Sequence, residues 1–380
     1  SSTVQITLSE PFAPFITILG LPHMSVIPRE EVEQLGADFA SAPVGTGPFR
    51  FVRWERGREI VLEANRDYFR GRPALDRIRF VIFPGNVVSE MVQAFERGEL
   101  EETPMSPERR EELLRPGKYI VVRKPTLSLR LLGFNLKHAP FDRREVRQAF
   151  NYAVDKLHLN QEIQEKPFAV AKGILPPGMP GYNPEVQGYS YDPDRARELL
   201  VQAGYPEGKG PAPVTLASGA KSVVARQDYR AVQQYLAAVG VQVEFKEFDD
   251  WPTFRQALQR GEHQIFRFVR YADYPDPDNF LYPLFHSQSQ TNYFRYHNPL
   301  VDRLLEDARR EMDDLRRAGL YREAEQLILN DAPGVMLQHL TFEELFQPYV
   351  EGIEVSALGG WYIPMRKIRL KSDSQPSAKK

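Results

Sequence analysis

Asp273 is the residue whose position best suits the binding of a ligand. It follows residues 265–269, an apolar run that predicts a strand. Arg267 alternates with Phe266 and Phe268 in this run, so its guanidinium must leave the face that the two rings bury. Ligands of α/β proteins bind at the carboxyl ends of parallel strands. A surface or salt-bridged arginine is the structural alternative for Arg267.

Trp251 opens the helix predicted before this strand. Its indole could give a ligand cleft a flat apolar wall, and the alternative is an ordinary core tryptophan. The acidic run 273–279 lacks the central glycine and the final glutamate of an EF-hand loop, and its two prolines favour a rigid turn. We therefore interpret Asp276 and Asp278 as Asx turns rather than calcium ligands.

Motifs of other chemistries are absent from the sequence. The seven histidines are scattered, with no H-x-x-x-H or H-E-x-x-H spacing, so we expect no metal site. The turn at Gly45 and Gly47 lacks the lysine of a P-loop, and Pro48 removes a backbone donor that a phosphate would need. No G-x-S-x-G elbow is present. We expect no cofactor and no enzymatic activity; a hydrolase that uses Asp273 with His286 is a distant alternative.

Composition narrows the class of protein further. The 380 residues carry a net charge of -2 and no cysteine, so there is neither a basic field for nucleic acid nor a disulfide framework or thiolate. No run approaches the roughly 20 apolar residues that span a bilayer. A chain of this length exceeds one typical domain, so two lobes are expected.

The remaining elements predict a mixed α/β protein. Residues 214–217, 225–239 and 241–245 form a strand-helix-strand unit that suits a parallel sheet. Asp142 and Asp192 are expected to cap helices, and residues 353–355 to form a late strand. The first ten residues alternate like a strand already in progress, without a targeting pattern, so we interpret the N-terminus as a cut or processed end. Residues 372–380 are expected to be disordered.

Several segments, taken together, resemble the family-5 solute-binding proteins, the oligopeptide, dipeptide and nickel receptors of ABC importers. The matching motifs, in chain order, are Pro43-Val44-Gly45-Thr46-Gly47-Pro48-Phe49; Gly133-Phe134-Asn135; Pro140-Phe141-Asp142; Val146-Arg147-Gln148-Ala149-Phe150-Asn151-Tyr152-Ala153; Leu175-Pro176-Pro177-Gly178; Tyr191-Asp192-Pro193; Ala203-Gly204-Tyr205; Ala272-Asp273; and Asp276-Pro277-Asp278-Asn279-Phe280. Each motif alone is weak, and their order and spacing make the combination specific.

The resemblance implies a periplasmic-binding-protein-like α/β fold of type II, peptide-binding cluster, with a discontinuous first lobe. On that basis, residues 1–40 would be a remnant of an accessory domain and its connection. Residues 41–134 would form lobe I, 135–348 lobe II and 349–371 a return segment to lobe I. The opening of lobe I and most of the accessory domain would be missing, and a ligand would be enclosed between the lobes by hinge closure.

Carried over residue by residue, the resemblance assigns five ligand-binding residues. Asp273 matches the carboxylate that pairs with the ligand's α-amino group, Arg267 an arginine that can receive a peptide carboxylate, and Trp251 a cavity tryptophan. Arg270 replaces an aromatic of the oligopeptide receptor, and Asn135 belongs to a matching motif.

The resulting hypothesis is a receptor for peptides or peptide-like solutes that delivers them to an ABC permease. It would act as a monomer in the periplasm or outside the cell, with a lipid anchor on a preceding segment left open. A truncated receptor-like scaffold or sensor subunit in a larger assembly is the alternative. The ligand's identity and length stay open.

Overall fold

The computed structural model describes residues 3–371, apart from residue 86 and residues 161–167, 207–209 and 220–222. It divides into two compact units: unit 1 comprises residues 1–20 and 125–341, and unit 2 comprises residues 21–124 and 342–380. The chain therefore passes between the units three times. None of the helices in the described part of the chain has both the length and the apolar character needed to cross a membrane.

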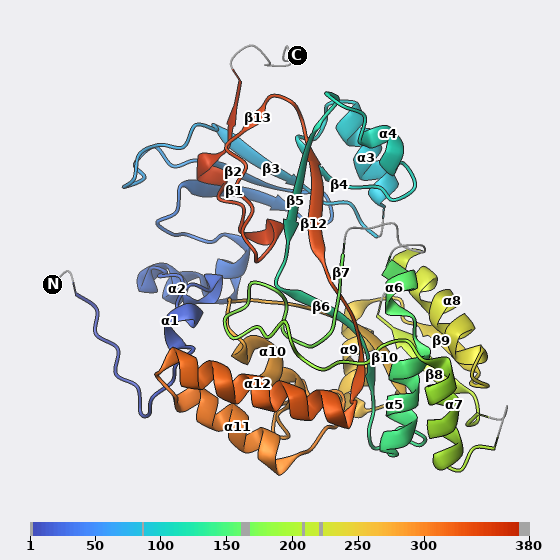
Figure 1. Cartoon of the computed structure of the whole chain (residues 1–380). Helices are drawn as coiled ribbons and strands as arrows, with labels where there is room; N and C mark the ends of the chain where they lie inside the picture. Colours follow the sequence, from blue (N-terminus) through green and yellow to red (C-terminus); the bar gives the residue numbers. More distant parts are fainter. Residues whose placement is uncertain (1–2, 86, 161–167, 207–209, 220–222, 372–380) are drawn as a thin grey trace. The chain divides into compact units, whose positions relative to one another are not determined.

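Unit 1 is built on a six-stranded mixed sheet in the order β7-β11-β6-β10-β8-β9 (Figure 1). Strand β6 is antiparallel to both its neighbours, whereas β8 is parallel to β9 and β10, which confirms the predicted parallel strand-helix-strand unit. The strands are β6 (Ser128–Phe134), β7 (Ala169–Val170), β8 (Val214–Ser218), β9 (Val243–Glu247), β10 (Ile265–Tyr271) and β11 (Gly334–His339).

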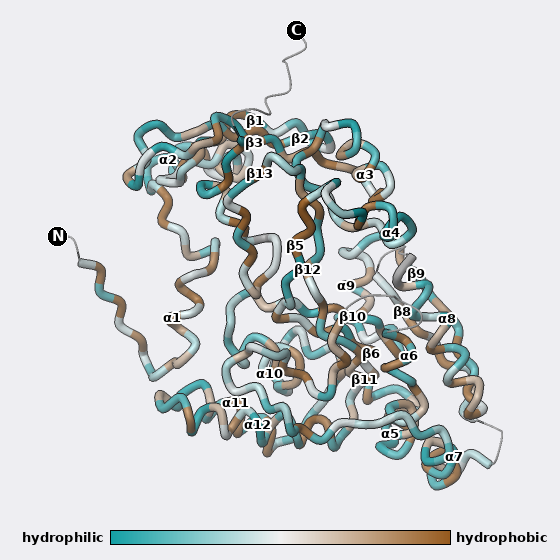
Figure 2. Tube along the Cα trace, turned by 45° about the horizontal axis from the view of Figure 1, so that its top comes forward, coloured by the Kyte–Doolittle hydropathy of each residue, from teal (hydrophilic) through white to brown (hydrophobic). Residues whose placement is uncertain are grey.

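Unit 1 also contains nine described helices. They are α1 (Phe15–Ile18), α5 (Arg144–Ala153), α6 (Lys156–His158), α7 (Pro193–Gln202), α8 (Val223–Ala237), α9 (Trp251–Arg260), α10 (Asp278–Phe285), α11 (Pro299–Arg310) and α12 (Asp314–Asp331). Buried residues of α5, α7 and α8 form one core cluster with those of the strands. Along α5 and α7 the trace alternates between hydrophilic and hydrophobic residues (Figure 2), as expected for helices with one buried face.

The structure confirms one of the two predicted N-cap residues. The Asp192 side chain accepts a hydrogen bond from the Arg195 N–H at 2.9 Å and caps α7, as predicted. Asp142 is not a cap, because α5 begins at Arg144 with Arg143 in the N-cap position, where no side chain makes a capping hydrogen bond.

Unit 2 contains two three-stranded antiparallel sheets, β1-β2-β3 and β4-β12-β5, and a short β13-β14 pair (Figure 1). Its strands are β1 (Phe49–Glu55), β2 (Glu59–Ala64), β3 (Arg77–Val81), β4 (Glu102–Pro104), β5 (Ile120–Pro125), β12 (Thr341–Phe346), β13 (Val350–Glu351) and β14 (Arg369–Leu370). Its helices are α2 (Arg29–Leu35), α3 (Val88–Glu96) and α4 (Arg110–Leu113), with 3-10 turns η1 (Pro22–Met24), η2 (Gly36–Ser41), η4 (Gly360–Tyr362) and η5 (Met365–Lys367).

The unit boundaries differ in position from those expected from the sequence. The first segment of unit 2 ends at residue 124 instead of the expected residue 134, because β6 is a central strand of the unit 1 sheet. The chain returns to unit 2 at residue 342, before the expected residue 349, since β12 lies in the middle of a unit 2 sheet. Residues 1–20 group with unit 1, where the Ala13 N–H donates to the Arg309 carbonyl at 2.8 Å.

Two predicted strands are corrected. The described residues 3–10 are not a strand although their apolar residues alternate, and Val4 is 86% exposed. Alternation produces a strand only where another edge pairs with it. The late strand lies at Val350–Glu351 instead of 353–355, because Gly352 turns the chain at a φ of 77°. The predicted disordered tail, 372–380, lies outside the described residues.

Candidate ligand-binding site

The register between β6 and β10 decides which predicted site residues share a face. Residues directly opposite each other in an antiparallel pair point to the same side of the sheet. Arg267 is opposite Leu132, and Arg270 is opposite Leu129. Because 267 and 270 differ by an odd number, the two arginines project from opposite faces.

Asp273 lies just past the carboxyl end of β10, as predicted, and it belongs to a small polar network. Its Oδ2 accepts hydrogen bonds from the Arg270 Nη2 at 2.7 Å and from the Asn279 Nδ2 at 3.3 Å. The Asp273 N–H donates to the Asn279 Oδ1 at 2.9 Å. The Asp273 side chain is 55% exposed. The carboxylate is therefore held in one orientation while much of its surface is accessible to a ligand.

Arg270 is the second member of this network and lies on the same face as Phe268. Its Nη2 also donates to the Asn279 Oδ1 at 2.8 Å, and its Nε donates to the Asn279 carbonyl at 3.1 Å. Asn279 therefore links Arg270 and Asp273 through both its side chain and its backbone. Sequence reasoning missed this role of Asn279, although the residue lies in one of the quoted motifs.

Trp251 lies on the same face of the sheet as Phe268. Its ring packs against Phe268, with the ring centroids 5.9 Å apart, and against Phe254 at 5.8 Å. The N-cap Asp250, which accepts from the Thr253 N–H at 2.7 Å, fixes the start of α9 at Trp251. Trp251 is 46% exposed, so it is not an ordinary core tryptophan and can offer an apolar wall.

Arg267 lies on the opposite face, within a buried ionic cluster. Its Nε donates to the Asp228 Oδ2 at 2.6 Å, and Asp228 on α8 has no exposed surface. A second arginine, Arg130, has its Nη1 3.9 Å from the same Oδ2 and donates to the Gln338 Oε1 at 2.8 Å. Burial lowers the pKa of Arg130 to about 10. The positive charge of Arg267 also lowers this pKa, whereas the negative charge of Asp228 raises it. The salt-bridged alternative for Arg267 is thus the observed one.

Asn135 is separated from the other four residues. It follows β6 at the end where Phe134 pairs with Ile265, whereas Arg270 and Asp273 lie at the other end of β10. Its side chain is buried, donates from Nδ2 to the Gly261 carbonyl at 3.1 Å and accepts from the Lys137 N–H at 3.1 Å. These bonds tie two loops together and give Asn135 a structural environment.

The acidic residues of the run 273–279 differ in their hydrogen-bond and ion-pair partners. Asp276 accepts from the Asp278 N–H at 2.9 Å, which confirms the Asx turn at Asp276. Both acids also form buried ion pairs that the sequence did not predict, Asp276 with both terminal nitrogens of Arg317 and Asp278 with Arg309. Asp278 begins α10, so the run ends in a helix rather than in a simple turn.

The candidate site therefore centres on Asp273 and Arg270, which Asn279 links, and Trp251 packs against Phe268 on the same face of the sheet as Arg270. It offers a partly exposed carboxylate, an adjacent guanidinium and an indole face. This arrangement suits recognition of a small charged solute by ion pairing and apolar contact.

A family model for bacterial extracellular solute-binding proteins, family 5 Middle, matches residues 1–292. Heme-binding protein A of Haemophilus influenzae is 31% identical over 369 residues, which cover 94% of this chain and 66% of that protein. The dipeptide-binding protein of Escherichia coli is 30% identical over 372 residues, which cover 94% of this chain and 68% of that protein. The chain thus spans about two thirds of the length of these relatives.

Solved structures agree with this relationship. The ABC transporter-associated periplasmic binding protein DppA from Helicobacter pylori, in complex with peptide STSA, superposes with a TM-score of 0.84 and 29% identity, covering 96% of this chain and 71% of that one. A dipeptide-binding protein from Pseudoalteromonas sp. SM9913, in complex with Met-Leu, superposes with a TM-score of 0.84 and 26% identity, covering 97% of this chain and 75% of that one. The predicted periplasmic-binding-protein-like fold is confirmed. The chain belongs to the bacterial extracellular solute-binding proteins of family 5.

Proposed function

We propose that this chain acts outside the cytoplasm as a monomeric receptor that binds peptides or peptide-like solutes and presents them to an ABC permease. Relatives named for dipeptides, di/tripeptides and glutathione support peptide-like ligands. Binding alone, without the making or breaking of a covalent bond, accounts for the groups at the site.

The observation that carries the proposal is the partly exposed Asp273 carboxylate at the end of β10. An ammonium group that leaves water needs a negatively charged partner, and the free amino terminus of a peptide is such a group. Asn279 holds the carboxylate in place, so little side-chain entropy is lost when the ligand binds. The exposed indole of Trp251 would contact an apolar side chain of the ligand.

Arg267 has a different part in this proposal. A ligand carboxylate could reach it only in competition with Asp228, whose charge would then be left buried without its closest partner. We therefore propose that Arg267 stabilises the sheet and that the recognition of free-amine ligands depends on Asp273.

Calorimetric titration of wild type and Asp273→Asn with a panel of dipeptides tests the proposal, after native mass spectrometry has identified any copurifying solute. We expect the substitution to weaken binding of free-amine dipeptides at least about tenfold, close to 1.4 kcal/mol. The N-acetylated forms of the same dipeptides, which lack the ammonium, are the matched control. Equal affinities of both proteins for a free-amine dipeptide would reject the amine anchor.

A further inference from the structure

Arg270 keeps two N–H donors unused beside the Asp273 carboxylate. A guanidinium group has five N–H donors in a fixed planar arrangement. The Arg270 Nε donates to the Asn279 carbonyl, and Nη2 donates to the Asn279 Oδ1 and to the Asp273 Oδ2. In the described part of the chain, no group accepts a hydrogen bond from Nη1. Because Nη1 keeps solvent-accessible surface on a side chain that is 22% exposed, its two N–H groups are available to a solute.

One residue fixes both charges of the pair. Asn279 accepts from Arg270 through its backbone carbonyl and its side-chain oxygen, and its Nδ2 donates to Asp273 at 3.3 Å. The Arg270 Nη2 and the Asp273 Oδ2 are 2.7 Å apart, so opposite charges lie side by side. Both charges therefore have set positions before a ligand arrives, which reduces the entropy cost of binding.

Apolar side chains adjoin the charged pair. Phe268 shares the Arg270 face of β10 because the two residues are two positions apart, and its ring packs against that of Trp251. Leu129, directly opposite Arg270 in β6, is buried. An environment of low polarity strengthens hydrogen bonds and ion pairs between the site and a complementary ligand.

The charge balance of the site decides which kind of ligand end fits it. Arg270 and Asp273 offset each other, and the two later acids of the run 273–279 pair with arginines of α11 and α12. An ammonium group alone would be attracted by the carboxylate and repelled by the guanidinium. A ligand end that carries an ammonium and a carboxylate together would meet an opposite charge with each of them.

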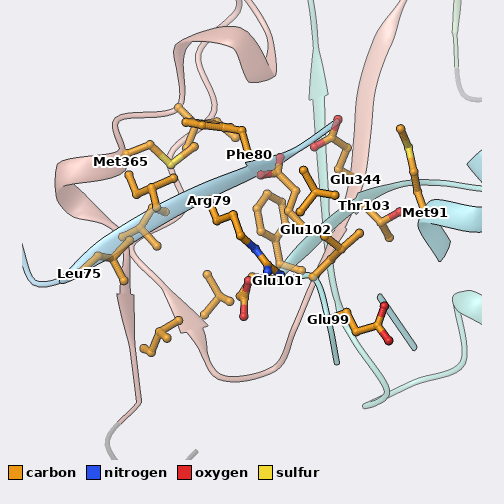
Figure 3. Close-up of a pocket in the computed structure, with 18 of the residues that line it drawn as sticks. Leu75, Arg79, Phe80, Met91, Glu99, Glu101, Glu102, Thr103, Glu344 and Met365 are labelled. Atoms are coloured by element: carbon orange, nitrogen blue, oxygen red, sulfur yellow. The ribbon is translucent and has the colours of Figure 1, made fainter. Parts of the chain in front are cut away.

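The carboxyl groups that line a pocket of unit 2 have no such cationic neighbour. This pocket has a volume of about 770 Å³, and Glu102 and Glu344 lie in its wall (Figure 3). Burial, followed by the hydrogen bond and the negative charge of Glu102, raises the pKa of Glu344 well above its usual range. Among the described residues, no lysine or arginine contributes to this pKa. These two carboxyls therefore lack a partner for a ligand carboxylate, which Arg270 supplies at the candidate site.

We propose that Arg270 makes the candidate site selective for peptides whose first residue is linked through its side chain, so that its α-ammonium and α-carboxylate are both free. The ammonium would bind Asp273, and the carboxylate would accept from the Nη1 of Arg270. An ordinary peptide has no such end, because the α-carboxyl group of its first residue is part of the peptide bond. A γ-glutamyl peptide has one. This inference rests on the amine-anchoring role of Asp273 proposed above.

Calorimetric titration with γ-glutamyl-alanine and with its α-carboxamide tests the proposal, because the two compounds differ only in the group that would meet Arg270. Wild type should bind γ-glutamyl-alanine about tenfold more tightly than the amide. The isomer α-glutamyl-alanine has the same net charge, but its side-chain carboxylate is farther from the ammonium. It should bind wild type roughly fivefold or more weakly than γ-glutamyl-alanine does.

Arg270→Gln should remove this preference. The variant should bind γ-glutamyl-alanine about tenfold more weakly than wild type does, and about as tightly as it binds the amide. Arg270→Lys keeps the positive charge without the planar donor arrangement, so it should keep part of the preference. Alanyl-alanine is the control for folding, because it has no carboxylate next to its ammonium and its affinity should not fall in Arg270→Gln. The comparison of the acid and the amide on wild type depends on no variant.

The proposal is overturned if wild type does not bind γ-glutamyl-alanine at millimolar concentration, or if it binds the acid and the amide equally. Equal losses of γ-glutamyl-alanine and alanyl-alanine in Arg270→Gln would also overturn it, because the arginine would then serve every ligand alike. Asp273→Asn separates this inference from the proposed function. Weaker binding of alanyl-alanine by that variant would uphold the amine anchor even where the carboxylate preference fails, and unchanged binding would reject both.

Discussion

Arg267 on β10 and Asp228 on α8 form a buried ion pair in which the Arg267 Nε lies 2.6 Å from the Asp228 Oδ2. Arg130 approaches the same carboxylate at 3.9 Å, so one acid faces two guanidinium groups. Removal of a single partner from such a cluster leaves a buried charge without compensation, which costs far more than the loss of a surface pair.

Asp228→Ala should therefore destabilise the protein by about 3–5 kcal/mol. Urea unfolding followed by circular dichroism measures the change. Glu198→Ala is the matched control, because Glu198 pairs with Arg195 on an exposed face of α7 and should cost about 1 kcal/mol or less. Similar costs for the two variants would show that the buried cluster is not important for stability.

Sequence patterns predicted the orientation of Arg267 but not its partner. Alternation with Phe266 and Phe268 correctly placed the guanidinium on the other face. Asp228 lies 39 positions away on a helix, and nothing in the pattern of that helix sets it apart from a solvent-exposed acid. The sequence does contain one indication of a buried acid: Arg130 lies between Leu129 and Leu131, in a strand where all seven residues are buried, and a buried arginine needs a negatively charged partner.

The same limit applies to the candidate site. The position of Asp273 after a strand followed from local hydrophobicity, and the exposure of Trp251 was one of two alternatives. The Asp273–Arg270–Asn279 network depends on how the chain turns back after β10, and the separation of Asn135 depends on strand direction. The pairing of strands that lie far apart in the sequence is set by long-range contacts, which local residue patterns do not specify.

Gly133 in β6 lies directly opposite Phe266 in β10, and the Phe266 ring covers the place of its missing side chain. A Cβ at this position would be 2.2 Å from the Phe266 Cζ. Gly133→Ala should therefore cost about 3 kcal/mol in unfolding free energy through overpacking. The double variant with Phe266→Leu should lose less than the sum of the two single losses.

Gly319→Ala is the matched control for this substitution. Gly319 lies in α12 with nothing within 4 Å of the added Cβ, so alanine should stabilise the protein by up to about 1 kcal/mol. Opposite signs for the two glycine variants in urea unfolding are the expected result. A neutral Gly133→Ala would mean that β10 shifts easily to accept the methyl group.

Glu325 on α12 is a buried acid whose ionisation opposes folding. Its Oε1 accepts hydrogen bonds from the N–H groups of Ile174 and Leu175 at 2.7 and 2.9 Å, yet burial raises its pKa to about 6. Between the ordinary value of 4.5 and about 6, the folded state binds more protons than the unfolded state. The stabilisation is therefore complete below pH 4.5 and is lost as the pH rises through 6.

Unfolding of wild type and Glu325→Gln at pH 4 and pH 7 tests this sign. The stability of wild type relative to the variant should fall by about 2 kcal/mol between the two pH values. Glutamine keeps an oxygen acceptor for the two N–H groups, so the difference isolates ionisation. The stability of wild type relative to Glu323→Gln, an exposed change on the same helix, should show no comparable fall. A wild type that became more stable relative to Glu325→Gln as the pH rose would contradict the assignment.

Arg270 competes with a ligand's ammonium group for the Asp273 carboxylate. Its Nη2 lies 2.7 Å from the Asp273 Oδ2, and Asn279 gives the guanidinium two other acceptors. Arg270→Gln should therefore strengthen binding of a free-amine dipeptide by roughly fivefold at low salt, close to 1 kcal/mol, because one positive charge near the ammonium is removed. The gain should shrink at 0.5 M salt, where the Debye length is only about 4 Å. Calorimetry on wild type, Arg270→Gln and the N-acetylated dipeptide separates this charge effect from a change in packing. Weaker binding in Arg270→Gln at every salt concentration would show instead that the arginine is needed to orient Asp273 toward the ligand.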